Sequence, residues 1–326
     1  MNKASIIYVA GHTGLIGSAI VRCLTHAGYQ RIVTKRRSEL DLLDWDSVSE
    51  FFDQVRPEYV VFAAGRVGGI IENQSFPADF MDENLSTQFH VLKAARRIGI
   101  KKLIFLGSSC MYPRECSQPM AEEALLSGRP EPTSLPYAVS KLVGLHLCLS
   151  YNKQDGQTKF LPLIPNSAFG PHDNFDPESG HVLAALIAKF HHAKVAGEQS
   201  VRLWGSGTPR REFIHADDIA GACLHVLEIE NHEIELPMNV GVGTDISIKE
   251  LATLISEIVG YRGALEWERS KPDGCPRKLL DSTRIRSSGW KPTVDLAEGL
   301  VSTYQWYVKN LDSTKVSRHP QTCQSV

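Results

Sequence analysis

Short, almost continuously apolar segments separated by helical patterns dominate the first third of the chain and constrain its fold most. They are Ser5–Ala10 (SIIYVA), Tyr59–Ala64 (YVVFAA) and Lys102–Leu106 (KLIFL). Such strands are buried on both faces, as in a parallel sheet covered by helices. Between the last two, Phe80–Ile98 reads as a long helix closed by Gly99, a residue suited to a helix C-cap. With right-handed crossovers, this alternation predicts an α/β fold, a doubly wound Rossmann sheet.

Composition fits an ordinary globular protein of about two domains. The 326 residues carry a net charge of −2, so a basic surface for nucleic acid or anionic membranes is not expected. No apolar run approaches the ~18 residues of a membrane span. Seven cysteines without a CxxC pair suggest neither a disulfide framework nor a metal site. Because the N-terminus lacks a signal-peptide pattern, we expect a cytoplasmic protein.

A glycine-rich loop follows the first predicted strand. Gly11, Gly14 and Gly17 stand in GHTGLIG, directly before a helical segment. This spacing permits a tight turn and the close approach of a pyrophosphate to the helix N-terminus, although a turn that only needs positive φ is the simpler alternative. The position in a βαβ pattern favours a nucleotide. At the end of the second strand, Lys35–Arg37 favours the 2′-phosphate of NADP over NAD, unless it is only a solvated charge run.

A tyrosine and a lysine four residues apart form a second motif, PYAVSKLVG. Tyr137 and Lys141 would share one face of a helix, where the lysine ammonium is expected to lower the pKa of the phenol. The phenol could then exchange a proton with a carbonyl or alcohol oxygen. Ser108 follows a buried strand, at the edge of the sheet where ligands bind, and could donate to the same oxygen. Capping or turn formation is the simpler role for Ser108 or Ser109.

These motifs, in this order, resemble the extended short-chain dehydrogenase/reductase family. The segments that carry the resemblance run from residue 10 to about 306 and include AGHTGLIGSAI, FLGSSCMYP, PYAVSK, FGPHDNF, WGSGTPRREFIH and SKPDGCPRKLLD. GSSCMYP and GPHDNF are similar to the segments of members that act on GDP-4-keto-6-deoxy-mannose. The resemblance therefore implies an NADP-dependent oxidoreductase and epimerase, which inverts C3 and C5 of that sugar and then reduces C4 with NADPH.

The same resemblance assigns roles to five side chains. Ser108, Tyr137 and Lys141 would serve the reduction, with Cys110 as the base and His181 as the acid of epimerisation. Protons at C3 and C5 are acidic because the polarised C4 carbonyl stabilises an enolate, and a thiol and an imidazole can both move protons near pH 7. Taken alone, Cys110 suits an inert buried cysteine and His181 a polar loop residue.

The resemblance also implies two binding regions. Residues 1–170, with a returning segment near 212–245, would form the NADP(H) domain; residues 171–311 would mainly form a smaller α/β substrate domain; and residues 312–326 would be a flexible tail. The implied cofactor residues are Gly11, His12, Thr13, Gly14, Leu15, Ile16, Gly17, Arg36, Arg37, Asp41, Leu42, Ala63, Ala64, Leu106, Gly107, Ser108, Ser109, Lys141, Pro165, Asn166, Ser167, Ala168 and His181. The implied substrate residues, which are cations for a diphosphate, an aromatic face and a carboxylate, are Lys189, Trp204, Arg211, Asp273 and Lys278. Surface salt bridges and core packing are their simpler alternatives.

The identity of the substrate stays open at this point. Pro165–Phe169 (PNSAF) departs from the family pattern beside the expected nicotinamide, so another GDP-4-keto sugar, deoxy or heptose, is an alternative. A non-catalytic NADP-binding sensor is a further alternative, which the presence of all five catalytic residue types disfavours. Family members are commonly homodimers joined through the Tyr–Lys helix and the helix near 80–97 as a four-helix bundle, so a homodimer is expected.

Overall fold

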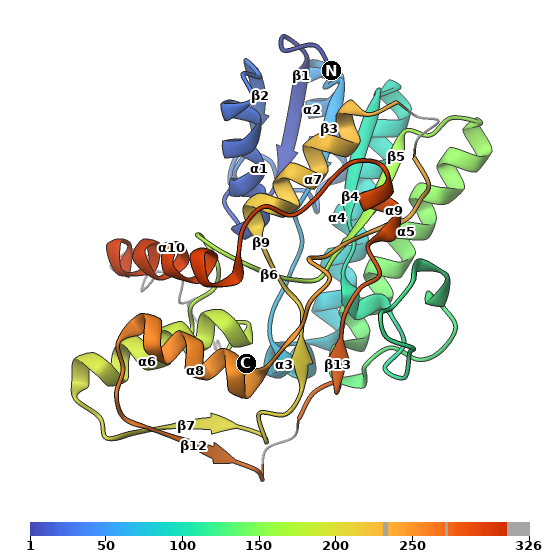
Figure 1. The fold of residues 1–326 in the computed structure, drawn as a ribbon. Helices are drawn as coiled ribbons and strands as arrows, with labels where there is room; N and C mark the ends of the chain where they lie inside the picture. Colours follow the sequence, from blue (N-terminus) through green and yellow to red (C-terminus); the bar gives the residue numbers. More distant parts are fainter. Residues whose placement is uncertain (231–233, 271–272, 312–326) are drawn as a thin grey trace, which may run out of the picture.

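Six parallel strands form the central sheet, in the order β10-β5-β4-β3-β1-β2 (Figure 1). The structure is a computed structural model that describes residues 1–230, 234–270 and 273–311. The predicted flexible tail, 312–326, lies outside the described residues. The strands are β1 (Ile6–Ala10), β2 (Arg31–Thr34), β3 (Tyr59–Phe62), β4 (Lys102–Leu106), β5 (Phe160–Pro165) and β10 (Met238–Val240). The predicted doubly wound Rossmann sheet is thus confirmed.

Helices cover both faces of this sheet, as the continuous apolar strands require. In β1, Ile7 and Val9 join one buried cluster, whereas Tyr8 and Ala10 join a second cluster on the opposite face. One face is covered by α1 (Leu15–His26) and α7 (Ala216–Glu228), and the other by α2 (Trp45–Val55), α4 (Pro77–Ile98) and α5 (Leu135–Asp155). Because successive side chains of a strand point to opposite faces, both helical layers are needed to bury it.

The long helix α4 begins earlier than its apolar pattern predicts. It starts at Pro77 rather than at Phe80, directly after the short helix α3 (Ile70–Ser75). Proline suits the first turn because its missing N–H would have no partner there. The helix ends as predicted at Gly99, whose φ of 74° closes it in the left-handed region.

A smaller lobe lies beyond the carboxyl ends of the sheet strands (Figure 1). Its elements are α6 (Val182–Ala196), α8 (Ile248–Val259), α10 (Leu296–Lys309) and the parallel pair β7 (Ser200–Trp204) and β12 (Ala264–Glu268). They enclose a separate apolar cluster that includes Phe190, Leu251 and Tyr307. The lobe therefore has a core of its own and faces the edge of the sheet where the glycine-rich loop emerges.

Very short strands join the two parts. One small sheet has the order β11-β8-β13, with β8 (Arg210–Arg211), β11 (Ile246–Ser247) and β13 (Arg277–Lys278), and a second pairs β6 (Ser167–Phe169) with β9 (Phe213–His215). The short helix α9 (Thr283–Ser287) and the 3-10 turns η1 (Ser109–Met111), η2 (Glu122–Ala124) and η3 (Pro132–Ser134) complete the fold. Strands of two or three residues carry no alternation, so the sequence analysis did not predict them.

No helix within the described ranges is long and apolar enough to cross a membrane. Those ranges also hold no group of three or more His, Cys, Asp or Glu side chains placed to bind a metal ion. The six cysteines of the described part of the chain are unpaired.

Candidate active site

The glycine-rich loop connects β1 to α1 at the point where the strand order reverses between β1 and β3, the usual ligand crevice of such sheets. Gly11 has a φ of 80°, and a Cβ there would lie 2.7 Å from the carbonyl oxygen of Ala63. A Cβ on Gly17 would lie 2.0 Å from the carbonyl oxygen of Gly11. Packing within the chain thus requires both glycines.

Gly14 differs from its two neighbours in the motif. Its φ of −81° is ordinary, and a Cβ there would meet only the Gly11 carbonyl oxygen, at 3.6 Å. It caps α1 with no side-chain hydrogen bond, and the first turn holds no acidic residue. The open N–H groups of Leu15, Ile16 and Gly17 therefore suit an anion, and the space at Gly14 fits a pyrophosphate.

Two further features of the crevice fit a dinucleotide. His12 Nδ1 is buried and has no hydrogen-bond partner. The exposed Arg36 guanidinium has no carboxylate within 4 Å among the described residues, whereas Arg37 lies near Asp41 and Glu83. An unpaired guanidinium beyond β2 is placed as a 2′-phosphate would need it.

The remaining predicted cofactor residues line the carboxyl ends of the sheet strands. Thr13 lies within the loop, and the Leu42 carbonyl is bonded to a ring nitrogen of His90 at 2.9 Å. Ala63 and Ala64 follow β3, Leu106 ends β4 with Gly107, Ser108 and Ser109 after it, and Pro165 ends β5 with Asn166, Ser167 and Ala168 after it. Parallel strands bring these loops to one edge.

Ser108 and Tyr137 meet beyond the end of β4. Ser108 caps η1, where its hydroxyl accepts from the Cys110 N–H at 3.2 Å, and it lies close enough to Tyr137 to affect the pKa of the phenol. Both the capping role and the contact with the phenol are therefore present. Burial raises the pKa of Tyr137, the Cys110 charge adds to that shift, and the Ser108 hydroxyl opposes it. The phenol accordingly holds its proton firmly, as a proton donor must.

Lys141 departs from the expectation that it lowers the pKa of Tyr137. It lies on α5, buried, and its Nζ donates to the Leu106 carbonyl at 3.1 Å. The ammonium is 5.9 Å from the Tyr137 ring centroid, and burial lowers its own pKa to about 8. The ammonium is thus committed to a backbone carbonyl, and burial of the phenol outweighs any help that it gives.

Cys110 is the residue around which the other predicted catalytic groups gather. Lys278 Nζ lies 3.4 Å from its Sγ, and the hydroxyls of Ser108 and Ser134 lie near enough to help lower its pKa. Burial alone would raise the pKa of this thiol, but the Lys278 charge and these hydroxyls outweigh burial and lower it. The charge of Cys110 also acts on Tyr137 and His181.

His181 caps α6 and is oriented by a residue that the sequence analysis missed. The Asp173 carboxylate lies 3.9 Å from His181 Nδ1, and its Oδ2 is buried without a hydrogen-bond partner. Loss of hydration at this site lowers the pKa of His181. The Asp173 carboxylate and the charges of Cys110 and Glu72 outweigh that effect and raise the pKa overall. The imidazole side chain is 48% exposed, so it is both biased towards the protonated form and open to a ligand. Asp173 stands within GPHDNF, which was the available signal.

The predicted substrate residues form two groups. Arg211 Nη1 donates to the Arg210 carbonyl at 2.7 Å, and its neighbour across the strand pair is Lys278. In the lobe, Lys189 Nζ lies 5.7 Å from the Trp204 ring centroid. Arg211 and Lys278 thus join the Cys110 group, whereas Lys189 and Trp204 form a separate pair on α6 and β7.

Asp273 and Arg211 differ in whether their charged groups already have partners within the protein. Asp273 accepts from the Ser206 N–H at 2.9 Å and from its hydroxyl at 2.6 Å. Arg211 has no carboxylate within ion-pair distance among the described residues, and burial lowers its pKa. A half-buried cation with no counter-ion in the described part of the chain favours an anionic ligand.

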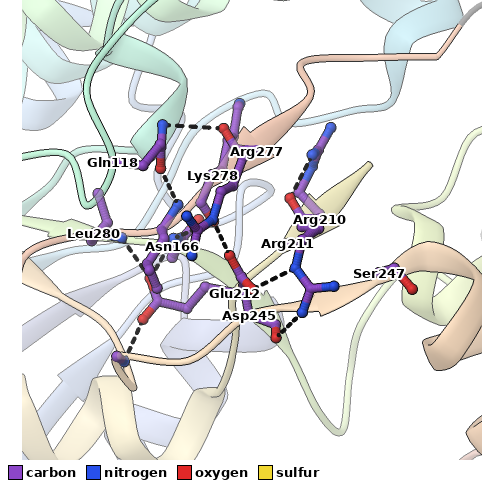
Figure 2. A network of polar contacts seen from close by, with 12 residues as sticks. Gln118, Asn166, Arg210, Arg211, Glu212, Asp245, Ser247, Arg277, Lys278 and Leu280 are labelled. Carbon is purple, nitrogen blue, oxygen red and sulfur yellow. Dashed lines mark hydrogen bonds and ion pairs between the residues drawn. The ribbon is translucent and has the colours of Figure 1, made fainter. Parts of the chain in front are cut away.

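A buried glutamate that the sequence analysis missed holds these strands together (Figure 2). Glu212 has no exposed surface and accepts from Asn166 Nδ2 at 2.5 Å, the Gly243 N–H at 2.6 Å and the Leu280 N–H at 3.0 Å. Beside it, Asp245 pairs with Arg210 and Arg277. These contacts link the loop after β5 to β8 and β13, so they connect the cofactor edge to the strand that carries Lys278.

The fold and this site define a class: a Rossmann sheet with a glycine-rich cradle and a Ser–Tyr–Lys group beyond its carboxyl edge. The chain belongs to the NAD dependent epimerase/dehydratase family, whose model matches residues 7–241.

Three relatives define the likeness more narrowly. The chain is 48% identical to "Probable GDP-L-fucose synthase 1" of Oryza sativa subsp. japonica, over 96% of this chain and 95% of the relative. It is 47% identical to the GDP-L-fucose synthase of Escherichia coli (strain K12), over 94% and 97%. A solved structure of MlghC, the GDP-mannoheptose C4 reductase of Campylobacter jejuni with NADP bound, superimposes with a TM-score of 0.86 at 37% identity, over 94% and 99%.

Proposed function

We propose that this protein converts GDP-4-dehydro-6-deoxy-D-mannose to GDP-L-fucose, by epimerisation at C3 and C5 and reduction at C4 with NADPH. The observation that carries the proposal is the group formed by Ser108, Cys110, Tyr137 and His181 at one sheet edge. A plain reductase needs only the hydroxyl pair. The thiol and the imidazole add the base and the acid that epimerisation requires. The similarity to curated GDP-L-fucose synthases at 44–48% identity supports the same substrate.

The four groups then divide the steps, and Tyr137 serves in both reactions. Ser108 and Tyr137 donate hydrogen bonds to the C4 oxygen and stabilise the enolate that forms when C3 or C5 loses a proton. Cys110 takes that proton, and His181 returns one to the same carbon from the opposite side. After both inversions, Tyr137 supplies the proton that the C4 oxygen needs for reduction. Its raised pKa suits a donor that must stay protonated until then.

The cofactor of the proposal is NADPH, which would supply hydride to C4 when bound. The space at Gly14, the open N–H groups of the first turn of α1 and the unpartnered His12 Nδ1 fit its pyrophosphate region. Arg36 would hold the 2′-phosphate. Lys141, which already contacts the Leu106 carbonyl, would hold the nicotinamide ribose.

The substrate diphosphate would lie against the half-buried Arg211 guanidinium. Arginine suits this position because its planar fork can bind two phosphate oxygens at once. The Lys189–Trp204 pair would take the nucleoside end in the lobe, since an aromatic face and a cation suit a base and its phosphate.

The test is a substrate panel with two variants. Purified protein should oxidise NADPH, seen as a loss of its absorbance, with GDP-4-keto-6-deoxy-mannose and not with the UDP and dTDP 4-keto sugars. Cys110→Ser should suppress solvent deuterium uptake at C3 and C5, whereas Cys116→Ser, a neighbouring cysteine, should not. Tyr137→Phe should slow hydride transfer by about 100-fold. A wild-type protein that leaves NADPH unchanged with the GDP sugar would overturn the proposal.

A GDP-4-keto heptose is the second candidate substrate. It is favoured by the PNSAF segment, which lies beside the expected nicotinamide, and by the likeness to the heptose reductase MlghC. The heptose is second because MlghC is 37% identical to this chain, whereas the relative from Oryza sativa is 48% identical. Including a GDP-4-keto-heptose in the panel separates the two: the preferred substrate is the one with the higher kcat/KM.

We also propose that the protein is a homodimer through α4 and α5, which pack side by side. The apolar side chains of Phe89 on α4 and Val143 on α5 are 47% and 48% exposed, and a second copy could cover them. Val143→Glu should then produce a monomer in analytical ultracentrifugation, and an unchanged sedimentation coefficient would contradict this interface. The expected cytoplasmic location stays a prediction.

A further inference from the structure

The contact between Lys278 and Cys110 gives the lysine a role that substrate binding does not explain. Lys278 Nζ donates to Cys110 Sγ at 3.4 Å, across 168 positions of sequence. An ammonium at this distance from a sulfur is a counter-ion for a thiolate. The side chain that was predicted to bind substrate is therefore already directed at the proposed base.

Hydrogen bonds on both sides hold the backbone that carries Lys278 (Figure 2). In β13, Lys278 pairs in register with Arg211 of β8. Its carbonyl accepts from the Glu212 N–H at 3.1 Å and from Asn166 Nδ2 at 3.4 Å. On the far side of the strand, Gln118 accepts from the Leu279 N–H at 2.9 Å and donates to the Arg277 carbonyl.

The neighbouring cation has a different environment. Arg211 lies beside Lys278 but donates to a backbone carbonyl, and the described residues place no carboxylate within ion-pair distance of it. One cation is thus paired with the thiol, and the other is open to an anionic ligand. The sequence analysis had assigned both residues to the diphosphate. The structure instead pairs Lys278 with the thiol and leaves only Arg211 open to the diphosphate.

We propose that Lys278 is the positioning residue that keeps Cys110 as a thiolate, with Arg211 left to bind the substrate diphosphate. The role of that thiolate in epimerisation rests on the proposed function, whereas the ion pair itself does not. The other groups that face Cys110 are the hydroxyls of Ser108 and Ser134, the phenol of Tyr137, the imidazole of His181 and the Arg211 guanidinium.

The chemical step balances without another reactant. The Cys110 thiolate takes the proton from C3 or C5; the C–H bond breaks, an S–H bond forms, and the electron pair moves to the C4 oxygen as an enolate. Protonated His181 then gives its proton to the same carbon from the other side. This leaves a neutral thiol and a neutral imidazole, and proton exchange with water restores the ion pair with Lys278 before the second inversion.

Titration of the thiol tests the ion pair directly. Thiolate absorbance in the ultraviolet would be followed against pH in the full-length protein, with Cys110→Ser subtracted as the blank. Lys278→Met should raise the midpoint by about one pH unit or more, since an opposite charge this close shifts a pKa by roughly one to three units. Lys278→Arg should keep the midpoint near that of wild type, and Lys189→Met, which removes a lysine of the other group, should leave it unchanged. An unshifted midpoint in Lys278→Met would overturn the proposal.

Deuterium uptake separates this inference from the proposed function. In Lys278→Met, exchange at C3 and C5 should fall about tenfold at pH 7 and recover as the pH rises and the thiol ionises. If Lys278 only binds substrate, Lys278→Met would instead raise KM equally across the pH range. That result would also overturn the assignment. The wild-type protein could take up no deuterium into any GDP sugar while its thiol still titrates at a lower pH than that of Lys278→Met. In that case the proposed function fails and the ion pair stands.

Discussion

The cofactor side and the substrate side of the site are held together in different ways. On the cofactor side, strands β1, β3, β4 and β5, of four to six residues each and buried on both faces, support the glycine-rich loop. On the substrate side, β8, β11 and β13 have two residues each, and the polar contacts of Glu212 and Asp245 hold them (Figure 2). Apolar burial does not depend on charged side chains, whereas the polar contacts do. We therefore expect changes of shape to destabilise the cofactor side and changes of charge to destabilise the substrate side.

The largest effect is expected at Gly17, on the cofactor side. Gly17→Ala would place a Cβ 2.0 Å from the Gly11 carbonyl oxygen, and backbone cannot move away as a flexible side chain can. We expect the free energy of unfolding to fall by about 3 kcal/mol, measured by urea denaturation, because inserted atoms force backbone shifts. NADPH binding should be lost as well.

The matched control lies three residues away. Gly14→Ala meets only an ordinary contact of 3.6 Å, so stability should stay close to that of wild type. Its methyl group would occupy the space proposed for the pyrophosphate, and NADPH affinity, measured by fluorescence titration, should fall. Wild-type affinity in this variant would place the pyrophosphate elsewhere.

The next effect tests the substrate side. Glu212→Gln keeps the shape of the side chain but removes one of two buried oxygens that accept from the Leu280 and Gly243 N–H groups and from Asn166. An unsatisfied buried donor costs about 1–3 kcal/mol, so we expect a loss of about 2 kcal/mol in urea denaturation. The exposed Glu257→Gln on α8 is the control and should leave stability unchanged. If the two sides are distinct, NADPH affinity of Glu212→Gln should persist; its loss would mean that the network also shapes the cofactor crevice.

The same contrast explains what could be predicted from the sequence. The sheet, the glycine-rich loop and the helix of Tyr137 are encoded locally, by apolar runs and short spacings. Glu212 depends on Asn166, 46 positions away, and on Leu280, 68 positions away, and a single glutamate in RREF carries no periodic signal. Two-residue strands exist only through such distant partners, so their arrangement appeared only in the structure, although the family resemblance had already named Arg211 and Lys278.

A third prediction concerns Asp173, which acts through His181. Because Asp173 raises the pKa of His181, Asp173→Asn should lower that pKa and move the alkaline limb of the deuterium-exchange profile to lower pH. A shift of one unit would reduce exchange about tenfold on the alkaline side and leave it nearly unchanged on the acidic side. A uniform loss across the pH range would indicate a structural role for Asp173 instead.

Stability provides a second readout with a defined sign. A histidine whose pKa is raised on folding stabilises the protein below its unfolded pKa, and this contribution is lost as the pH rises through the folded pKa. Asp173→Asn should therefore be destabilising at pH 5 and less so at pH 9 in urea denaturation. The effect should be small, because the His181 side chain is 48% exposed.

The smallest effect is expected at the Lys189–Trp204 pair, far from the reacting carbons in the proposed arrangement. Lys189→Met keeps the aliphatic stem on the ring and removes the charge that lies 5.7 Å from the Trp204 centroid. Such cation–π contacts are worth about 0.5–1 kcal/mol at exposed sites, so we expect KM for the GDP sugar to rise about two- to fivefold with kcat unchanged. Lys249→Met, on the exposed surface of α8, is the control. A fall in kcat for Lys189→Met would place this lysine among the groups that act on the sugar, and the division between a nucleoside-binding pair and the Cys110 group would then be wrong.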